Sequence, residues 1–588
     1  MPRKKPFSSK QKKFQLQDKR QRKKESTQDE DDTEDIETAG QDSSQSQKKL
    51  RKGKSGPIPD RRTDPNRYRL QFFKESNEEI DRRKKLARRP LRHLPEEALE
   101  VNIDQVYQPG SVLDLPKRPP WNYSLSKAKL EAREQNYFQD YTEAIFEKYS
   151  PEQLSYFELN LETWRQLWRV LEMSDILLLI LDIRYPVLHM SPALYHTVTH
   201  DLGKSIIIIL NKVDLAPPPL VIAWKNFLQE KYEKVHIVLF TSYPNEALAE
   251  GGNETKAKMR RKRGGGAWTR AMGQGQLLSV CQDIVGDKVD LRSWQDKMVS
   301  VSSTVKEEEE IADSSVVGGE DDDGLYKQGD TTLFQNGVLT IGCVGYPNVG
   351  KSSLLNGLVG KKVVSVSRTP GHTKHFQTIF LTRTVKLCDC PGLVFPSLID
   401  KSLQILAGIY PIAQVREPYS PVGFLAERID VVKQLCLKHP HYEGNKAQSQ
   451  IEWSAYDICQ AWAEKRGFIT AKSGRPDLYR AANNLLRMGL DGRLCLCLRP
   501  LGYAENKGQW DQHPETLKLI SDLEFYRVND DVSDGEDESS DDELGHLVLE
   551  QDSDDDDEGG SEEEEEENKD ESKYVSNNPF ALLDSDDD

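Results

Sequence analysis

Short apolar runs alternate with amphipathic stretches through the middle of the chain. Apolar residues at three- and four-residue spacing over 154–171 predict a helix, and the apolar run 176–181 that follows predicts a buried strand. The same patterns predict strands at 205–210, 236–240, 337–344, 378–381 and 385–388, and helices at 191–202, 221–232 and 352–358. Such alternation is typical of a mostly parallel sheet covered by helices on both faces, so we predict an α/β fold.

Helical periodicity continues from about 402 to 490, most clearly at 455–465 and 477–488, and predicts a smaller helical domain after the α/β domain. We place the α/β domain at 151–400 and the helical domain at 401–505. A partly helical extension at 66–150 is expected to precede both.

Charged segments flank and interrupt this pattern. Residues 1–24 hold 11 Lys/Arg and one acidic residue, whereas 530–588 hold 28 Asp/Glu and two lysines. Segments with so few apolar residues cannot offset the entropy cost of ordering by burial. We therefore predict a disordered basic arm at 1–65, a disordered acidic tail at 530–588, and a mostly unfolded insert at about 245–335 in which only 277–284 looks structured.

The formal net charge of −17 comes from the tail, because residues 25–529 sum to −1. An acidic chain of this kind does not exclude a nucleic-acid partner. No apolar run approaches the roughly 18 residues of a membrane span, and the amino terminus has no apolar segment after its charges, so we expect neither a secreted nor a membrane protein. A monomer is expected.

The eight cysteines form no Cys-x-x-Cys pair. Cys388 and Cys390, like Cys495 and Cys497, are spaced at two, which places both side chains on one face of a strand. Buried reduced thiols are the favoured interpretation and zinc ligation is the alternative.

The sequence Gly345-Tyr-Pro-Asn-Val-Gly350-Lys351-Ser352 fits the pattern Gly-x4-Gly-Lys-Ser and lies between a predicted strand and a predicted helix, the context in which this motif binds phosphate. Its backbone amides would wrap the α- and β-phosphates, Lys351 would reach the β/γ oxygens, and the Ser352 hydroxyl would ligate Mg²⁺. The helix amino terminus adds its dipole. The predicted phosphate-binding residues are Gly345, Asn348, Val349, Gly350, Lys351, Ser352 and Ser353.

A second motif, Asp389-Cys-Pro-Gly392, follows the predicted strand 385–388. Alone it would be an ordinary turn, but beside a P-loop it predicts that Asp389 belongs to the Mg²⁺ shell and that the Gly392 amide senses the γ-phosphate.

The motif Asn211-Lys212-Val-Asp214 directly follows the predicted strand 205–210, and it indicates which nucleotide base the protein binds. A carboxylate at Asp214 can accept hydrogen bonds from guanine N1–H and N2–H₂ together, whereas adenine offers no such donor pair. Asn211 would brace neighbouring loops, and the Lys212 stem would lie along the base plane. Thr241 and Ser242, after the next strand, are placed to offer a backbone amide to guanine O6.

The base-recognition motifs precede the phosphate motifs, which is the reverse of the order in an ordinary G domain. In this order the chain resembles the circularly permuted GTPases of the YlqF/YawG type within the TRAFAC class, the group that includes nucleostemin. The resemblance covers roughly residues 150–500. It implies a circularly permuted P-loop GTPase domain that binds GTP or GDP with Mg²⁺, followed by the helical domain.

The resemblance also suggests roles for further residues. Thr369-Pro-Gly-His-Thr373 resembles switch I and implies that Thr373 binds Mg²⁺, with Thr369 as the alternative; the catalytic candidates are then Lys351, Thr373, Asp389 and Gly392. Asp182-Ile-Arg184 resembles the family's Asp-Ala-Arg element. Leu393 occupies the position at which Ras-like enzymes place the glutamine that orients water. A hydrophobic residue there implies slow intrinsic hydrolysis and, with Asn348, a K⁺ ion at the phosphates. His372 is either a water-orienting group or a solvated loop histidine.

Members of the family mostly act in assembly of the large ribosomal subunit, which implies rRNA or preribosomal particles as partners of the basic arm and helical domain. The arm, like residues 256–263, is also suited to be a nuclear or nucleolar address, or simply a solvated charged segment. Ser533, Ser540 and Ser553 precede acidic residues and suit phosphorylation, and the acidic tail suits basic proteins. We predict a hydrolysing GTPase in the nucleus or nucleolus, with the cytoplasm as the alternative. A GTP-dependent binding scaffold is the second hypothesis, and a small-molecule kinase is disfavoured because it gives Asn211 and Asp214 no role.

Overall fold

The computed structural model describes residues 69–122, 124–242, 271–303, 316–317, 333–441, 452–470 and 473–531. All of them belong to one compact unit, Tyr68–Asp588, which is distinct from the unit Met1–Arg67. The predicted basic arm, nearly all of the predicted acidic tail and much of the predicted insert lie outside the described residues.

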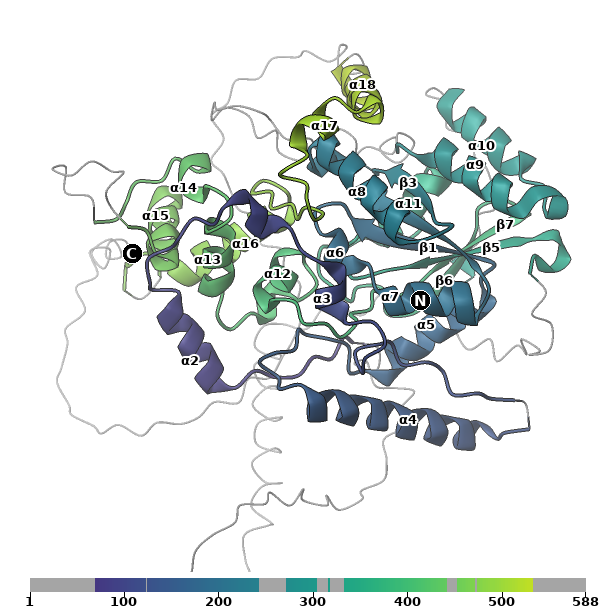
Figure 1. Ribbon diagram of the computed structural model, residues 1–588, viewed down its shortest axis with the longest axis horizontal. Coiled ribbons are helices and arrows are strands. Elements are labelled where there is room, and N and C mark those ends of the chain that lie inside the picture. Colours follow the sequence, from purple (N-terminus) through teal and green to yellow (C-terminus); the bar gives the residue numbers. More distant parts are fainter. Residues whose placement is uncertain are drawn as a thin grey trace, which may run out of the picture. The chain divides into compact units, whose positions relative to one another are not determined.

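A seven-stranded sheet with the order β3-β2-β1-β5-β7-β6-β4 lies at the centre of the fold (Figure 1). The strands are β1 (Ile176–Asp182), β2 (Ser205–Asn211), β3 (His236–Phe240), β4 (Val316–Val317), β5 (Leu339–Val344), β6 (Gln377–Phe380) and β7 (Val385–Asp389). The first five strands in this order pair in parallel, whereas β6 pairs antiparallel with β7 and β4 antiparallel with β6. The mostly parallel α/β fold is therefore confirmed.

The register of the sheet brings the ends of several strands to one edge. Asp182 of β1 pairs with Asn211 of β2, which pairs in turn with Phe240 of β3, and Asp389 of β7 lies opposite Cys343 of β5. Strands β1 and β5 are buried along their whole length, as expected for apolar runs covered on both faces. The loops that follow β1, β2, β3, β5 and β7 therefore meet at the same side of the sheet.

Helices lie on both faces of the sheet (Figure 1). They are α5 (Leu161–Met173), α6 (Pro186–His189), α7 (Pro192–His196), α8 (Pro218–Lys231), α9 (Gln274–Val285), α10 (Arg292–Ser303) and α11 (Lys351–Val359), with a π-helical turn at Thr197–Asp201 and a 3-10 turn at Val213–Leu215. Two sequence predictions need correction. The helix expected from 154 begins only at Leu161, where the Asn160 side chain caps it. The insert contains two helices, α9 and α10, and the short strand β4, rather than one short structured stretch.

Helices also precede and follow this domain. Before it lie α2 (Asn77–Leu86), a 3-10 turn (Glu96–Leu99), α3 (Ile103–Tyr107) and α4 (Lys127–Lys148); after it lie α12 (Lys401–Leu406), α13 (Tyr419–Ala426), α14 (Val431–Gln434), α15 (Ala455–Arg466), α16 (Leu478–Leu490), α17 (Lys507–Asp511) and α18 (Pro514–Asp531). Ser454 forms a capping box with Asp457 at the start of α15, and Asp477 caps α16. The helical segment shares one hydrophobic core with the sheet. No helix among the described residues is long and apolar enough to cross a membrane.

Candidate nucleotide-binding site

The loop between β5 and α11 has a backbone that demands glycine at both ends. Gly345 has φ 152°, and a Cβ there would lie 2.7 Å from the carbonyl oxygen of Ile180. Gly350 has φ 100°, and a Cβ there would collide with the Asn211 side chain. The loop therefore needs both glycines in order to turn tightly between strand and helix.

Lys351, the first residue of α11, is buried and folds back over this loop. Its Nζ donates hydrogen bonds to the carbonyl oxygens of Gly345 (3.2 Å) and Tyr346 (2.7 Å). Burial lowers the pKa of Lys351, while the negative charge of Asp389 acts in the opposite direction. The ammonium is thus held inside the loop, where phosphate oxygens can replace the carbonyl partners.

Three predicted Mg²⁺ ligands converge at the start of α11. Ser352 Oγ donates to Asp389 Oδ2 at 2.8 Å and lies 3.4 Å from Thr373 Oγ1. Burial raises the pKa of Asp389 to about 6, although Lys351 and Ser352 act against the rise. Its Oδ1 is buried and has no hydrogen-bond partner among the described residues. Two hydroxyls and a carboxylate with an unsatisfied oxygen form a donor set that suits a hard cation such as Mg²⁺.

A cleft beside these groups is lined by the P-loop, by the segment 365–373 and by Gly392. Thr369, the alternative Mg²⁺ ligand, lines the cleft together with Thr373. Gly392 is so close to the P-loop that a Cβ would lie 2.7 Å from the Pro347 backbone. Val349 and Ser353 are also predicted phosphate-binding residues. Val349 precedes Gly350 and is buried in the hydrophobic core, whereas Ser353 follows Ser352 and lines the cleft.

Leu393 and His372 differ in their positions relative to the cleft. The Leu393 side chain is buried in the hydrophobic core, and its backbone N–H donates to Gly345 O at 3.3 Å. His372 is exposed, and its Nε2 lies 3.0 Å from Ser365 Oγ. His372 also lines the cleft beside the P-loop, so its position fits both a water-orienting group and a solvated loop histidine.

Asn211 and Asp214 lie at the carboxyl end of β2. Asn211 Nδ2 donates to the P-loop carbonyl of Val349 at 2.7 Å, so Asn211 connects the two loops as a bracing residue would. The Asp214 carboxylate is buried and accepts a hydrogen bond from Thr241 Oγ1 at 2.5 Å. The Thr241 amide is engaged with Met272 O, whereas the buried Ser242 Oγ has no hydrogen-bond partner among the described residues. Thr241 thus orients Asp214 through its side chain, which sequence reasoning missed.

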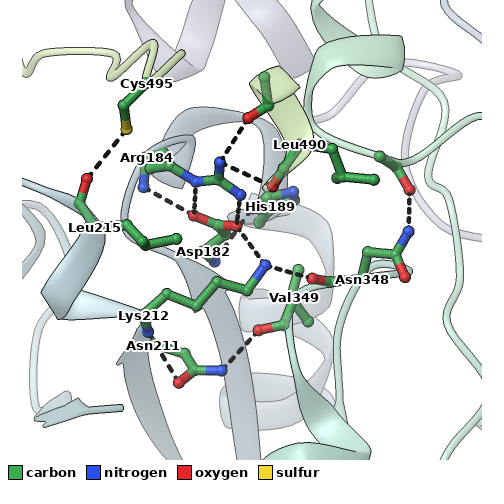
Figure 2. A network of polar contacts seen from close by, with 12 residues as sticks. Asp182, Arg184, His189, Asn211, Lys212, Leu215, Asn348, Val349, Leu490 and Cys495 are labelled. Carbon is green, nitrogen blue, oxygen red and sulfur yellow. Dashed lines mark hydrogen bonds and ion pairs between the residues drawn. The ribbon is translucent and has the colours of Figure 1, made fainter. Parts of the chain in front are cut away.

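Lys212 connects the loop after β2 to the P-loop through its Nζ. Its Nζ donates to Asp182 Oδ2 at 2.8 Å and to Asn348 O at 2.7 Å (Figure 2). Asn348 in turn donates through its side-chain amide to the carbonyl oxygens of Arg368 and Gly408, both at 2.8 Å. The base-recognition loop, the P-loop and the segment after α12 are therefore linked by direct hydrogen bonds.

A buried ion pair at the end of β1 completes this network. Arg184 and Asp182 are almost inaccessible to solvent, and the guanidinium donates to both carboxylate oxygens, at 3.0 and 2.8 Å (Figure 2). Arg184 Nη1 also donates to Gly489 O (3.1 Å) and Leu490 O (3.2 Å) at the end of α16. Burial alone would raise the pKa of Asp182, but Arg184 and Lys212 hold it well below its usual range.

A P-loop with its lysine and hydroxyl, a carboxylate at the end of β7 and a second carboxylate, Asp214, held by Thr241 after β2 are the features of a guanine nucleotide-binding P-loop protein. Residues 340–419 match the family described as 50S ribosome-binding GTPase. Guanine nucleotide-binding protein-like 1 of Homo sapiens and of Mus musculus are each 52% identical over 551 residues, covering 88% of this chain and 89% of theirs.

Two further similarities are weaker. Large subunit GTPase 1 of Schizosaccharomyces pombe is 31% identical over 446 residues, covering 73% of this chain and 66% of that protein. GNP-bound YlqF from T. maritima covers 57% of this chain and 96% of its own, with 17% identity and a TM-score of 0.32. The chain belongs to the guanine nucleotide-binding protein-like 1 family of GTPases, which confirms the resemblance expected from the order of its motifs.

Proposed function

We propose that this protein binds GTP with Mg²⁺, hydrolyses it slowly, and changes conformation with nucleotide state during assembly of the large ribosomal subunit. The convergence of Ser352, Thr373 and Asp389 beside the P-loop carries the nucleotide part of this proposal. The ribosomal part is supported by the description of the matching family and by the name of the Schizosaccharomyces pombe relative.

The residues of the site divide the work between phosphate and base. The P-loop amides and Lys351 bind the phosphates, and the Ser352, Thr373 and Asp389 oxygens hold Mg²⁺, which neutralises phosphate charge when bound. Asp214, held by Thr241, accepts the two guanine donors.

Slow turnover follows from the lack of a water-orienting group at Leu393. Its aliphatic side chain is buried and has no polar atom with which to position a nucleophile. In the same proposal, Asn348 is a ligand for K⁺, and this ion would add positive charge beside the phosphates. Equal GTP turnover in sodium and potassium buffers would contradict this last part.

A nucleotide-dependent scaffold with negligible turnover is the second candidate function, favoured by the same buried Leu393. Single-turnover rates with and without purified preribosomes separate the two candidates. Acceleration by the particle supports the assembly GTPase, whereas an unchanged rate close to zero supports the scaffold.

Partner binding is tested by co-sedimentation of the full-length protein with particles from a cell lysate, in a GTP analogue and in GDP, at two salt concentrations. The variants Ser352→Asn and Asp389→Ala disrupt the proposed Mg²⁺ shell and serve as nucleotide-defective controls. Nucleotide-dependent migration with large-subunit precursors supports the proposal and nuclear or nucleolar action. Absence from every ribosomal fraction, with GTP still bound, would contradict it.

In the same proposal, the basic arm contacts rRNA and the acidic tail contacts basic proteins. The arm and nearly all of the tail lie outside the described residues. Eleven cations in the arm imply a steep salt dependence of RNA binding. Deletion of 530–588 should strengthen RNA binding at fixed salt if the tail covers the arm in the free protein.

The base assignment has its own test. Replacing Asp214 with Asn exchanges an acceptor for a donor, which matches the C2 carbonyl of xanthine better than the amino group of guanine. We expect Asp214→Asn to lose guanine nucleotide affinity and to gain affinity for xanthine nucleotides. Unchanged preference for GDP would show that another group reads the base.

A further inference from the structure

Cys495 and Cys497 lie side by side in the extended segment that follows α16. Their sulfur atoms are 3.6 Å apart, and both residues are partly exposed to solvent. Cys388 and Cys390 have the same spacing but are fully buried, and the exposed Cys436 serves as a solvent-accessible reference thiol. The Cys495 and Cys497 thiols are therefore close to each other and can be reached by small molecules.

The backbone fixes this arrangement. Leu494, Leu496 and Leu498 are buried, so the alternate side chains of the extended segment, Cys495 and Cys497, share the opposite face. Leu498 N donates to Arg184 O at 2.8 Å, which anchors the segment to the end of β1. Two extended residues span about 6.6 Å between Cα atoms, which is at the upper end of the range that a disulfide bridges.

The pair contacts the loop that carries the base-recognition residues. Cys495 Sγ donates to Leu215 O at 3.1 Å, and Cys497 Sγ lies 4.0 Å from the same oxygen (Figure 2 draws the Cys495 contact). Leu215 directly follows Asp214, which is buried and held from its other side by Thr241. The thiols thus help to set the position of the loop that reads guanine.

We propose that Cys495 and Cys497 form a reversible disulfide that weakens guanine nucleotide binding. The oxidant is a small-molecule disulfide such as oxidised glutathione. One cysteine thiolate attacks it, which breaks its sulfur–sulfur bond and releases one thiol; the second cysteine then attacks the mixed disulfide and releases the other thiol. The protein loses two electrons and two protons, and one glutathione disulfide becomes two glutathione molecules.

Cys495 is the better placed attacking group. Hydrogen bonding with Cys497 lowers the pKa of the Cys495 thiol most; burial acts in the opposite direction, and the Arg184 charge lowers the pKa further, below the usual range. Once Cys495 is deprotonated, Cys497 remains as the thiol donor of the pair. Transient disulfides of this kind occur as redox sensors even where glutathione keeps most thiols reduced.

Oxidation changes the contact with the base-recognition loop in two ways. The sulfur atoms move from 3.6 Å to about 2.05 Å apart, and neither retains a proton to donate to Leu215 O. Loss of one donor to this carbonyl should raise the Kd for GDP by about three- to tenfold. Reduction with dithiothreitol should restore it.

The test uses the full-length protein carrying Cys436→Ser, so that the exposed reference thiol does not react. After treatment with a series of glutathione redox buffers, mass spectrometry should find a loss of two hydrogens in the peptide that contains 494–499. Titration with a fluorescent GDP analogue should then give the higher Kd only in the oxidised sample. The variants Cys495→Ser and Cys497→Ser, which cannot form the bond, should keep one Kd in all buffers.

The proposal depends on guanine nucleotide binding but not on the ribosomal role, since neither readout uses a ribosomal particle. If 495 and 497 stay as free thiols in buffers that modify Cys436 of the unsubstituted protein, the disulfide does not form and the proposal is wrong. If the disulfide forms but the Kd for GDP is unchanged, the proposed effect of the disulfide on the base-recognition loop is wrong. A response that persists in Cys497→Ser would assign the effect to another thiol.

Discussion

Replacing Arg184 with Met tests whether the buried ion pair at the end of β1 holds the nucleotide domain and the helical segment together. The substitution keeps most of the side-chain volume but removes both guanidinium bonds to Asp182 and the two bonds to Gly489 O and Leu490 O, whereas the backbone N–H bond to Asp182 Oδ1 stays. What remains is a carboxylate that is only 1% exposed and has Lys212 as its nearest cation, at 2.8 Å. In the unfolded chain, in contrast, water solvates the same carboxylate fully.

Removing one partner of a buried pair costs about 3–5 kcal/mol because the other charge stays buried. Lys212 offsets part of this cost, whereas the loss of a donor for two carbonyls at the end of α16 adds about 1 kcal/mol. We expect Arg184→Met to lower the free energy of unfolding by about 3–5 kcal/mol. Arg368→Met is the matched control, because Arg368 pairs with Asp491 at 3.2 Å while 57% exposed and should cost less than about 1 kcal/mol.

Urea unfolding at 25 °C without nucleotide measures both variants through the midpoint and slope of the transition. The loss of unfolding free energy in the double variant Asp182→Asn/Arg184→Met should be smaller than the sum of the losses in the two single variants. We expect the difference to be about 2 kcal/mol. Additive effects, or a loss below about 1 kcal/mol for Arg184→Met, would refute the reasoning.

The ion pair between Asp182 and Arg184 also predicts how the stability of the protein changes at acid pH. Because Arg184 and Lys212 depress the folded-state pKa of Asp182, the ionised carboxylate contributes stability above its unfolded pKa of about 3.9, and this contribution falls as the pH drops below that value. In Arg184→Met the folded-state pKa should rise, so the variant should lose less stability than the unsubstituted protein between pH 4 and pH 2. An equal loss would show that Asp182 does not depend on Arg184.

Three further outcomes follow from the nucleotide site. Since burial raises the pKa of Asp389 to about 6, Mg²⁺-dependent GDP binding should weaken about tenfold per pH unit below 6, and titrations with Asp389→Asn should lack this dependence. Thr241→Val removes the hydroxyl that donates to Asp214 and should raise the Kd for GDP about tenfold, whereas Thr241→Ser should restore it. Gly350→Ala, at φ 100° and in collision with Asn211, should abolish detectable GDP binding in the same titration, and wild-type affinity would contradict the loop geometry.

The strands other than β4, and the P-loop, could be predicted because their signals are local. A run such as 176–181 is apolar at every position and lies within β1, and the glycine positions of a phosphate loop have fixed spacing. The stretch 154–160 carries an apolar helical pattern but forms no helix, because its backbone bonds to distant segments. Ser155 N and Ser155 Oγ both donate to Ser397 O, 242 positions away. Tertiary contacts of this kind override local periodicity.

The site was predictable in its residue types but not in its connections. The P-loop motif indicated Ser352, the Asp-x-x-Gly motif indicated Asp389, and the family resemblance indicated Thr373 with Thr369 as the alternative. Ser352, Thr373 and Asp389 converge in the structure. The partners of Arg184 could not be inferred, since Gly489 O lies 305 positions away and any residue type could supply a carbonyl. The helices of the insert were underestimated because strongly charged flanks lower the average hydrophobicity around α9 and α10, although Leu277, Leu278 and Cys281 are buried.

Three of the contacts between the helical segment and the nucleotide domain reach different parts of the nucleotide site. Cys495 contacts the base loop through Leu215, Arg184 joins the end of β1 to α16, and Asn348 joins the P-loop to Gly408 and to Arg368. A ligand shifts a conformational equilibrium only through contacts that differ between its states. GTP and GDP present the same base, so the base-loop contact can sense occupancy but not the γ-phosphate. Asn348 lies in the phosphate loop itself and donates to Arg368 O, in the segment that precedes Thr373, and to Gly408 O. Of these three contacts, the Asn348 contact is therefore the one that we expect to respond to the γ-phosphate, alongside the Gly392 amide proposed for that role.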